Sequence, residues 1–315
     1  MWAYAMAAPG RLKRVQAPVP AVTAGRVLVR LQAGGICGSD LPTFRGRPNP
    51  FLDFYGSPGF PLHEVVGEVV DGDLPKGTRV VGWAERHLGL AEYFVARVDE
   101  VLEIDDALSA TDATVIQPLC TVLHALDRLG DVAGRHVAVL GQGPIGILFS
   151  HALHARGARV TGVDRVDRRG LNFGVDEVVW GDAADWAATQ TDGPEIVIEA
   201  IGHQAGTFEA AVEAVAPGGV VLAFGVPDET HYAFGFARFF RRNLTLIGGV
   251  TTDRRRALAA ARDYLREHPD LLAPYVTDVF AVEQAQAAFE CAIAPAPGRL
   301  KVVLDAAPSG AGTRP

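Results

Sequence analysis

The stretch Val137-Ala138-Val139-Leu140-Gly141-Gln142-Gly143-Pro144-Ile145-Gly146 decides the fold of this chain. An apolar strand-like run leads into a Gly-x-Gly-x-x-Gly turn, and a helical pattern follows. Gly141 permits the tight turn, Gly143 lets the backbone approach a pyrophosphate, and Gly146 lets the helix pack closely on the strand. Pro144 is tolerated in the first helical turn, where the free N–H groups attract phosphate. The stretch therefore predicts a dinucleotide-binding turn.

The sequence on both sides of this turn alternates between apolar strands and helices. This rhythm predicts a parallel sheet covered on both faces, and six strands are the number in a full dinucleotide-binding sheet. The expected strands are 136–140, 159–163, 177–180, 195–199, 219–224 and 244–248, with helices over 145–156 and 207–214. The chain is therefore expected to be an α/β protein with a doubly wound, Rossmann-type parallel sheet.

Asp164 ends the strand that follows the turn, about 20 residues further on, where a carboxylate accepts hydrogen bonds from the adenosine ribose. Such a carboxylate repels a 2′-phosphate, so it favours NAD. Arg165, Arg168 and Arg169 follow at once and could serve a 2′-phosphate. NAD is the expected coenzyme, with NADP as the alternative.

The rest of the chain has a different pattern. Residues 1–115 are expected to be rich in β-strands and turns, and residues 46–61 read as a long loop of the kind that often carries function. The part after residue 272 is mixed and ends in a strand-like run over 299–304. The tail 308–315 is rich in Gly, Pro and Ser and is expected to be disordered.

Composition excludes several classes of function. The chain has 315 residues, which suggests two domains, and 49% hydrophobic residues provide sizeable cores. The net charge of −8 argues against nucleic acid as the main partner, because phosphate binding needs a basic surface. We find neither a transmembrane stretch nor a secretory signal, so no membrane association is expected. Three cysteines in unrelated contexts indicate no disulfide framework and favour the cytoplasm.

Cys37, in Gly-Ile-Cys-Gly-Ser-Asp, and the pair His63-Glu64 are candidate ligands of a catalytic zinc ion. A thiolate, an imidazole and a carboxylate are ligands that zinc takes, and a catalytic zinc keeps one position open. An alcohol bound there loses its proton more easily and can then release a hydride to a nicotinamide.

These pieces, in this order and spacing, resemble the zinc-dependent medium-chain dehydrogenases, especially the sorbitol, threonine and glucose dehydrogenase branch. The matching segments are 35–40, 63–64, 90–95, 117–119, the glycine turn, 199–202, 217–219 and 298–303. The resemblance covers nearly the whole chain, and jointly these motifs are highly specific.

The resemblance implies a GroES-like, β-rich catalytic domain over 1–117 and 272–315, with the Rossmann domain over 118–271 inserted in it and the active site in the cleft between them. It implies that Cys37 and His63 bind zinc, that Glu64 is a ligand or close neighbour, and that Ser39 takes the alcohol proton. The candidate nucleotide-binding residues are Gly141, Gly143, Pro144, Ile145, Gly146, Asp164, Arg165 and Arg169, with Thr121, Ala200 and Phe224.

The chain departs from this family at Gln117, where polyol dehydrogenases usually carry a glutamate that binds the zinc or its water. Gln117 is expected to be a neutral fourth ligand, since Cys37 and Glu64 already match the zinc charge. Cys120, one helical turn further on, is the alternative ligand, although a small buried side chain is the plainer interpretation. Thr121 shares the face of Gln117 and by resemblance would touch the nicotinamide.

Two further departures concern proton transfer and assembly. Relatives often have a histidine at position 42, where this chain has proline, so water, a ribose hydroxyl or a residue such as His87 must relay the proton. Only residues 83–90 fill the place of a four-cysteine lobe that binds a structural zinc in relatives. We expect one catalytic zinc, no structural zinc, and a homodimer formed through the edge strand at 244–248.

The leading hypothesis is a zinc enzyme that transfers a hydride between a secondary alcohol (a polyol, sugar, cyclitol or amino-alcohol) and NAD. The main alternative is a zinc-free quinone or enoyl reductase of the same fold using NAD(P)H. The unusual residues Gln117 and Pro42 are consistent with it. The presence of Cys37, His63 and Glu64 argues against it, because zinc-free relatives lack the cysteine and the histidine. A non-catalytic nucleotide-binding protein is a third hypothesis. In the two enzyme hypotheses the partner is a small alcohol or carbonyl substrate.

Overall fold

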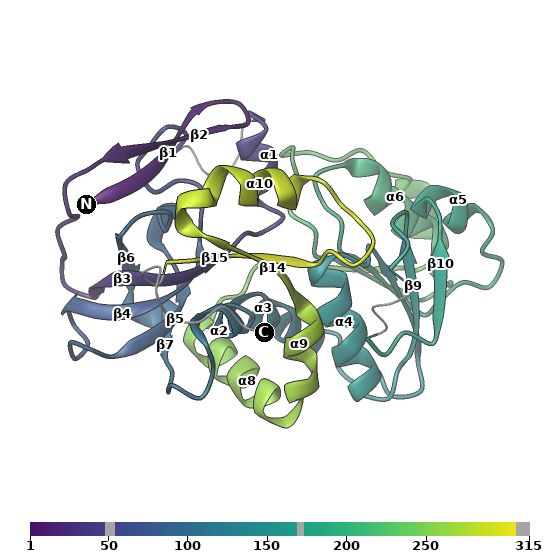
Figure 1. Cartoon of the computed structure of the whole chain (residues 1–315). Coiled ribbons are helices and arrows are strands. Elements are labelled where there is room, and N and C mark those ends of the chain that lie inside the picture. Colours follow the sequence, from purple (N-terminus) through teal and green to yellow (C-terminus); the bar gives the residue numbers. More distant parts are fainter. Residues whose placement is uncertain (48–53, 169–172, 307–315) are drawn as a thin grey trace. The chain divides into compact units, whose positions relative to one another are not determined.

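The computed structural model describes residues 1–47, 54–168 and 173–306, which form two compact units (Figure 1). The first unit holds residues 1–120, 253–295 and the segment from 299, and the second holds 121–252 and 296–298. The domain boundaries expected from the sequence, after residue 117 and before 272, stay predictions. The expected tail 308–315 and residues 48–53 of the expected loop lie outside the described residues.

The first unit is built on a seven-stranded sheet in the order β14-β15-β3-β4-β5-β7, with β6 pairing on β3. All pairs are antiparallel except the β14–β15 pair, whose strands are joined by α10. The strands are β3 (Arg26–Gly35), β4 (Glu64–Gly72), β5 (Arg79–Trp83), β6 (Tyr93–Arg97), β7 (Val101–Glu103), β14 (Val276–Ala281) and β15 (Lys301–Asp305), beside a separate hairpin of β1 (Trp2–Ala8) and β2 (Arg11–Gln16). The β-rich reading of the first third is confirmed.

The helices in this unit are α1 (Asp40–Phe44), α2 (Ala110–Ala113), α8 (Arg254–Glu267), α9 (Leu272–Tyr275) and α10 (Ala285–Ile293), with 3-10 turns η1 (Glu85–His87), η2 (Val98–Glu100), η3 (Pro269–Leu271) and η4 (Val282–Gln284). The α-helices range from four residues in α2 to fourteen in α8. Helix α3 (Ile116–Asp127) runs from the first unit into the second. The predicted strand 299–304 is observed as Lys301–Asp305, one residue longer at its end and two shorter at its start, where the Leu300 N–H donates to the Thr277 hydroxyl instead of to a strand carbonyl.

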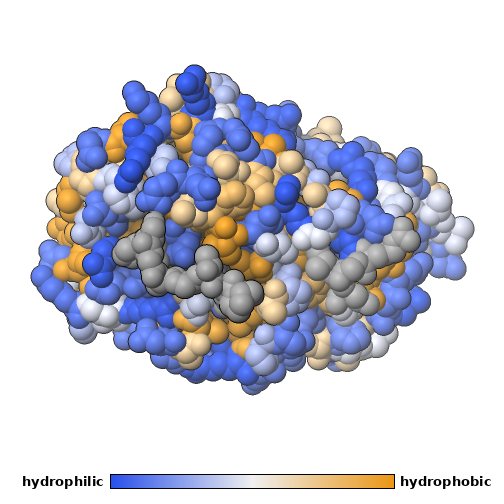
Figure 2. Space-filling view, in the orientation of Figure 1, coloured by the Kyte–Doolittle hydropathy of each residue, from blue (hydrophilic) through white to orange (hydrophobic). Residues whose placement is uncertain are grey.

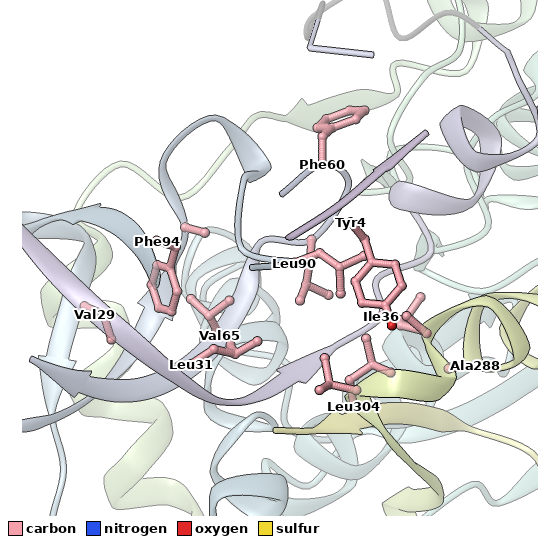
Figure 3. Packing of buried hydrophobic residues seen from close by; sticks show 14 of the residues in the cluster. Tyr4, Val29, Leu31, Ile36, Phe60, Val65, Leu90, Phe94, Ala288 and Leu304 are labelled. Carbon is pink, nitrogen blue, oxygen red and sulfur yellow. The ribbon is translucent and has the colours of Figure 1, made fainter. Parts of the chain in front are cut away.

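The core of the first unit lies where apolar side chains of the sheet meet those of the hairpin and of α10 (Figure 3). Val29, Leu31 and Leu304 come from the sheet, Tyr4 from β1 and Ala288 from α10, and each is at least nine-tenths buried. β3, β4 and β15 carry runs of consecutive buried residues, so both faces of the sheet are covered along much of these strands. The core fixes the ends of β3 and β4, where the candidate ligands lie.

The second unit contains six parallel strands in the order β10-β9-β8-β11-β12-β13. This is the doubly wound order in which nucleotides bind at the carboxyl ends of the strands. The strands are β8 (His136–Leu140), β9 (Arg159–Asp164), β10 (Glu177–Trp180), β11 (Ile196–Glu199), β12 (Val220–Ala223) and β13 (Thr245–Gly248), and the helices are α4 (Pro144–Ala155), α5 (Ala183–Ala188), α6 (Ala205–Ala214) and α7 (Phe236–Arg241). The predicted Rossmann-type sheet and both predicted helices are confirmed.

Hydrophilic residues predominate on the face of the molecule in Figure 2, and hydrophobic residues form separated patches there. Within the described ranges, no helix combines the length and apolar character that crossing a membrane requires.

Candidate functional site

Three metal-ligating side chains gather in the first unit where β3 ends and β4 begins. Antiparallel pairing places Gly35, the last residue of β3, opposite Glu64, the first residue of β4. Cys37 therefore leaves β3 beside the point where His63 leads into β4. One ligand atom from each of Cys37, His63 and Glu64 lies within 4.8 Å of the others. The sheet register thus unites the three residues that the sequence analysis selected.

The chemistry of this donor set fits a zinc ion. A cysteine sulfur, an imidazole nitrogen and a carboxylate oxygen are ligands that zinc accepts, and three protein ligands are the usual number in a catalytic site. His63 and Glu64 are buried, whereas Cys37 is partly exposed. Cys37 is therefore the least buried of the three residues.

Asp40, at the start of α1, orients the imidazole of His63. Its Oδ1 lies 3.1 Å from His63 Nδ1, and its Oδ2 accepts the backbone N–H of Cys37 at 3.2 Å. A histidine that donates Nδ1–H to a carboxylate presents Nε2 to a metal. Burial acts to raise the pKa of Asp40, but His63 and His87 outweigh it and hold that pKa well below its usual range. Asp40 is therefore an ionised anchor for the ligand ring.

His87, in the η1 turn between β5 and β6, packs directly on His63. The two ring centroids are 4.1 Å apart, and His87 Nδ1 lies 3.6 Å from Asp40 Oδ1. Arg86 and His87 both have left-handed backbones, with φ of 57° and 59°, a conformation that is uncommon outside glycine. Burial and the nearby charge of His63 lower the pKa of His87. The structure thus makes His87 a packing partner of a candidate ligand, and its role as a proton relay stays a prediction.

A buried lysine faces the candidate ligand Glu64 on its other side. The ammonium of Lys301, on β15, contacts Glu64 Oε2 and donates a hydrogen bond to the Ile36 carbonyl at 3.0 Å. Both side chains are at most 2% exposed. Gly35 leaves the space for them, because a Cβ there would lie 2.5 Å from Glu64 Oε2 and 2.8 Å from Lys301 Cε. Glu64 therefore has a cationic partner besides any metal.

The remaining sequence-selected residues of this part lie on α1 and α3. Gln117 is buried on α3, and its role as fourth ligand stays a prediction. Cys120 is also buried, and burial raises its thiol pKa far above the usual range. It belongs to none of the ligand groups formed by the described residues, so the packing interpretation is the one supported. Ser39 is partly exposed at the start of α1, and its hydroxyl caps no helix N–H.

Tyr275, at the end of α9, is fully buried, and its hydroxyl has no hydrogen-bond partner among the described residues. Burial raises the pKa of this phenol well above its usual value, and the charges of Glu64 and Cys37 act in the same direction. An unpaired buried hydroxyl is costly. Tyr275 is therefore a polar group close to the candidate ligands that the sequence did not reveal.

In the second unit, the glycine turn has the geometry that nucleotide binding needs. Gly141 has φ of +90°, which only glycine adopts readily, and a Cβ on Gly146 would collide with the Gly141 carbonyl oxygen. Pro144 begins α4, and Gly143 precedes it with open space where a Cβ would stand. The turn thus leaves room above Gly143 for a pyrophosphate at the N-terminus of α4, beginning with Pro144 and Ile145.

Asp164 lies at the carboxyl end of β9, next to this turn. Its Oδ2 accepts the backbone N–H of Gln142 at 2.6 Å, and its Oδ1 accepts that of Val166 at 2.7 Å. Arg168 Nη1 also donates to Oδ2, at 3.2 Å. Arg165 instead points towards Asp182, 3.9 Å away, and is largely exposed. Asp164, the predicted ribose acceptor, therefore lies beside the glycine turn and is paired with Arg168.

The other candidate nucleotide residues are spread over the same unit. Ala200 follows β11, and its neighbour Ile201 lies against Gly141. Phe224 follows β12 and packs edge-on against Phe149 of α4, with centroids 4.8 Å apart. Thr121 lies within α3, and Arg169 is outside the described residues. Their contacts with a coenzyme stay predictions.

Sequence reasoning gave no role to Asp40, Lys301 or Tyr275. Asp40 lies in the Gly-Ser-Asp segment that follows Cys37, so its position near a candidate ligand was visible in the sequence. Lys301 is a charged residue within the apolar run 300–304, which is a signal of a buried charge that needs a partner. For Tyr275 the sequence holds no such signal, because only packing decides whether a tyrosine hydroxyl is paired.

Two family models match most of the chain. Residues 23–106 match the alcohol dehydrogenase GroES-like domain, and residues 144–266 match the zinc-binding dehydrogenase domain. The matched ranges include Cys37, His63 and Glu64 in the first case and Asp164 in the second.

Among curated proteins, a D-altritol 5-dehydrogenase of Agrobacterium fabrum is 30% identical over 289 residues, which cover 78% of this chain and 82% of that protein. A solved structure from Sinorhizobium meliloti 1021 with bound NADP has a TM-score of 0.78 at 22% identity, covering 96% of this chain and 98% of that one. A short chain alcohol dehydrogenase from Escherichia coli CFT073, complexed with NADH, has a TM-score of 0.81 at 21% identity, covering 97% and 99%.

Proposed function

Because the chain belongs to the zinc-dependent medium-chain dehydrogenase superfamily and has its GroES-like and Rossmann folds, we propose that it holds one catalytic zinc ion and prefers NAD. The same relationship makes it an NAD(P)-dependent alcohol dehydrogenase. Its proposed substrate is a secondary alcohol of the polyol, sugar, cyclitol or amino-alcohol class. Similarity to a D-altritol dehydrogenase supports the polyol class.

The observation that carries this proposal is the group of Cys37, His63 and Glu64, whose ligand atoms lie within 4.8 Å of one another. The mechanism of a zinc-free quinone or enoyl reductase does not require a thiol, an imidazole and a carboxylate to lie close together. Cys37 and His63 would hold the zinc, with Glu64 as a ligand or close neighbour and Gln117 as a neutral fourth donor. The zinc would supply Lewis-acid chemistry by polarising the oxygen of a bound alcohol.

The chain's own residues would orient the ligands and move the proton. Asp40 fixes the His63 ring so that Nε2 is the nitrogen available to a metal. Ser39 Oγ, two residues after the candidate ligand Cys37, would accept the proton of the substrate hydroxyl. Pro42 cannot carry this proton further, so the route from Ser39 to solvent uses water, a ribose hydroxyl or another side chain.

In the nucleotide site, the turn from Gly141 to Gly146 would cradle the pyrophosphate, and NAD would supply the hydride acceptor. Asp164 would accept hydrogen bonds from the adenosine ribose and repel a 2′-phosphate, which supports the preference for NAD. Thr121, Ala200 and Phe224 would line the remaining part of the coenzyme site.

We also propose a homodimer in the cytoplasm. β13 is an edge strand of the six-stranded sheet, and an unpaired edge invites pairing with a second copy. Leu246 on this strand is 42% exposed and Val250 just after it 77% exposed. All three cysteines are free, as expected in a reducing compartment.

Metal content per chain of freshly purified protein tests the proposal, with Cys37→Ala as the variant and Cys291→Ala as its matched control. We expect close to one zinc per chain in the wild type and in Cys291→Ala, and its loss in Cys37→Ala. Zinc-dependent oxidation of polyols with NAD should follow the same pattern. A folded wild type that binds nucleotide without zinc would contradict the mechanism and direct the search to quinone and enoyl substrates.

A further inference from the structure

Tyr275 is far from the candidate ligands in the sequence, yet the sheet brings it close to one of them. It is the last residue of α9, and Val276, the first residue of β14, pairs with Lys301 on β15. The ammonium of Lys301 in turn contacts the carboxylate of Glu64. The register of β14 and β15 therefore places Tyr275 next to the segment that carries the buried partner of Glu64.

The hydroxyl of Tyr275 is a buried hydrogen-bond donor without an acceptor. The side chain is fully buried, and the hydroxyl has no hydrogen-bond partner among residues 1–47, 54–168 and 173–306. Leaving such a group unpaired costs the free energy of removing it from water. Tyr4, in the same unit, shows the ordinary case, because its hydroxyl donates to the Glu283 carbonyl at 3.2 Å. The exception at Tyr275 therefore calls for an explanation, and one kind of explanation is a functional role.

Glu64 offers an acceptor that is incompletely used. A carboxylate has about four acceptor positions. Among the described residues, Glu64 Oε2 contacts the Lys301 ammonium but has no partner with the geometry of a hydrogen bond. Both side chains are at most 2% exposed, so bulk solvent does not reach the remaining positions. An unpaired donor and an underused acceptor therefore lie in the same buried part of the unit.

Electrostatics keep the phenol of Tyr275 protonated and favour Glu64 as its acceptor. Burial raises the pKa of this phenol well above its usual value, and the charges of Glu64 and, to a lesser extent, Cys37 act in the same direction. The phenol therefore keeps its proton at neutral pH. A hydroxyl that donates to a carboxylate forms a charge-assisted hydrogen bond, which is stronger than one between neutral groups.

We propose that Tyr275 is a positioning residue for Glu64: its hydroxyl donates a hydrogen bond to the Glu64 carboxylate when zinc is bound, and so strengthens zinc binding without touching the ion. This inference rests on the proposed function, which assigns zinc to Cys37, His63 and Glu64. In the structure, Glu64 faces Lys301 and the phenol is unpaired. A carboxylate that turns towards zinc gives up part of its contact with Lys301, and the Tyr275 hydroxyl offers it a replacement. The hydrogen bond therefore belongs to the metal-bound arrangement rather than to the fold as such.

The purified full chain and two variants test this inference, with zinc as the probe. Tyr275→Phe removes only the unpaired hydroxyl, and Tyr4→Phe is the matched control that removes a paired hydroxyl from the same unit. Urea denaturation in the presence of a chelator measures stability without metal. Competition with a chromophoric chelator measures the Kd for zinc, a readout that a merely structural role would not change.

We expect Tyr275→Phe to unfold at the same urea concentration as the wild type or a higher one, because the metal-free fold loses no hydrogen bond. Its Kd for zinc should rise about tenfold, the effect of losing one charge-assisted hydrogen bond. Tyr4→Phe should show the opposite pattern, with a lower urea midpoint and an unchanged Kd for zinc.

A second comparison identifies the acceptor. The double variant Glu64→Gln/Lys301→Met removes the carboxylate without leaving Lys301 unpaired, and the other candidate ligands remain. Adding Tyr275→Phe to this background should raise the Kd for zinc about twofold at most, because residues that act through each other lose their interaction energy together.

Three results would overturn the inference alone. They are an unchanged Kd for zinc in Tyr275→Phe, a Tyr275→Phe variant that does not fold or is destabilised without metal as much as Tyr4→Phe, and the full rise in Kd persisting in the Glu64→Gln/Lys301→Met background. A folded wild type that binds no zinc would instead refute the proposed function, and this inference with it.

Discussion

Lys301 and Glu64 illustrate at the residue scale how a candidate metal ligand can be constrained by a charge that is distant in the sequence. The pair is buried between β15, β3 and β4, and Glu64 is at the same time one of three candidate zinc ligands. Removing the solvent from two charges is costly unless they compensate each other. Lys301 therefore stabilises the carboxylate whenever the metal does not, which makes it a positioning residue for Glu64.

Replacing Lys301 with methionine should leave Glu64 buried and uncompensated. We expect Lys301→Met to lower the free energy of unfolding of the metal-free protein by about 3–5 kcal/mol, measured by urea denaturation in the presence of a chelator. The double variant Glu64→Gln/Lys301→Met should recover a large part of this loss. Equal destabilisation in the single and double variants would show that packing, not charge, is what Lys301 contributes.

The cysteines provide a second residue-scale prediction. Cys120 is buried with a raised thiol pKa, whereas Cys37 is partly exposed. The thiolate is the reactive form, so iodoacetamide at pH 8 should leave Cys120 unmodified in the folded protein. Cys37 should react after a chelator removes the metal and should be protected when zinc is bound, as measured by mass spectrometry of the peptides. Modification of Cys120 at the rate of Cys37 would contradict its assigned packing role.

At the scale of elements, two glycines in the turn between β8 and α4, Gly146 and Gly143, have different roles. Gly146 is required for packing, because a side chain would collide with the Gly141 carbonyl. Gly143 has a negative φ of −73° and open space around it, so alanine fits there without strain. One glycine therefore serves the fold, and the other serves the ligand.

Gly146→Ala and Gly143→Ala should consequently fail in different ways. Gly146→Ala should destabilise the protein by about 1–3 kcal/mol, as overpacking does, and nucleotide binding should weaken with it. Gly143→Ala should keep the unfolding midpoint of the wild type yet lose about tenfold or more in affinity for NADH, because the methyl group occupies the pyrophosphate space. Thermal unfolding and NADH titration measure both. Unchanged NADH affinity in a folded Gly143→Ala variant would argue against this placement of the pyrophosphate.

At the scale of the whole molecule, assembly depends on the edge strand β13. Leu246→Lys places a charge on that strand, where charges discourage edge-to-edge pairing. If the proposed dimer forms through β13, light scattering after gel filtration should give half the wild-type mass for Leu246→Lys, with unchanged zinc content. As a control, Val279→Lys changes another exposed apolar residue, in the first unit (53% exposed against 42% for Leu246), and should leave the mass unchanged. A monomeric wild type, or a dimer that survives Leu246→Lys, would rule out this interface.

The sequence by itself determined the α/β architecture with its six-stranded Rossmann sheet. Strand–helix alternation and the glycine turn are local signals, because each depends on residues within a few positions of one another. The positions of the six strands and the first turn of α4 follow from these signals, whereas the spatial order of the strands comes only from the structure. For the same reason Cys37, His63 and Glu64 could be selected by residue type.

Only the tertiary structure decided what surrounds those residues. The pairing of Gly35 with Glu64, the contact of Lys301 with that carboxylate and the stacking of His87 on His63 join segments that are distant in the chain. Arg168 is close to Asp164 in sequence, yet only the fold shows that the two side chains form a largely buried ion pair. Such contacts follow from packing and desolvation of the folded chain, and no local pattern of residues specifies them.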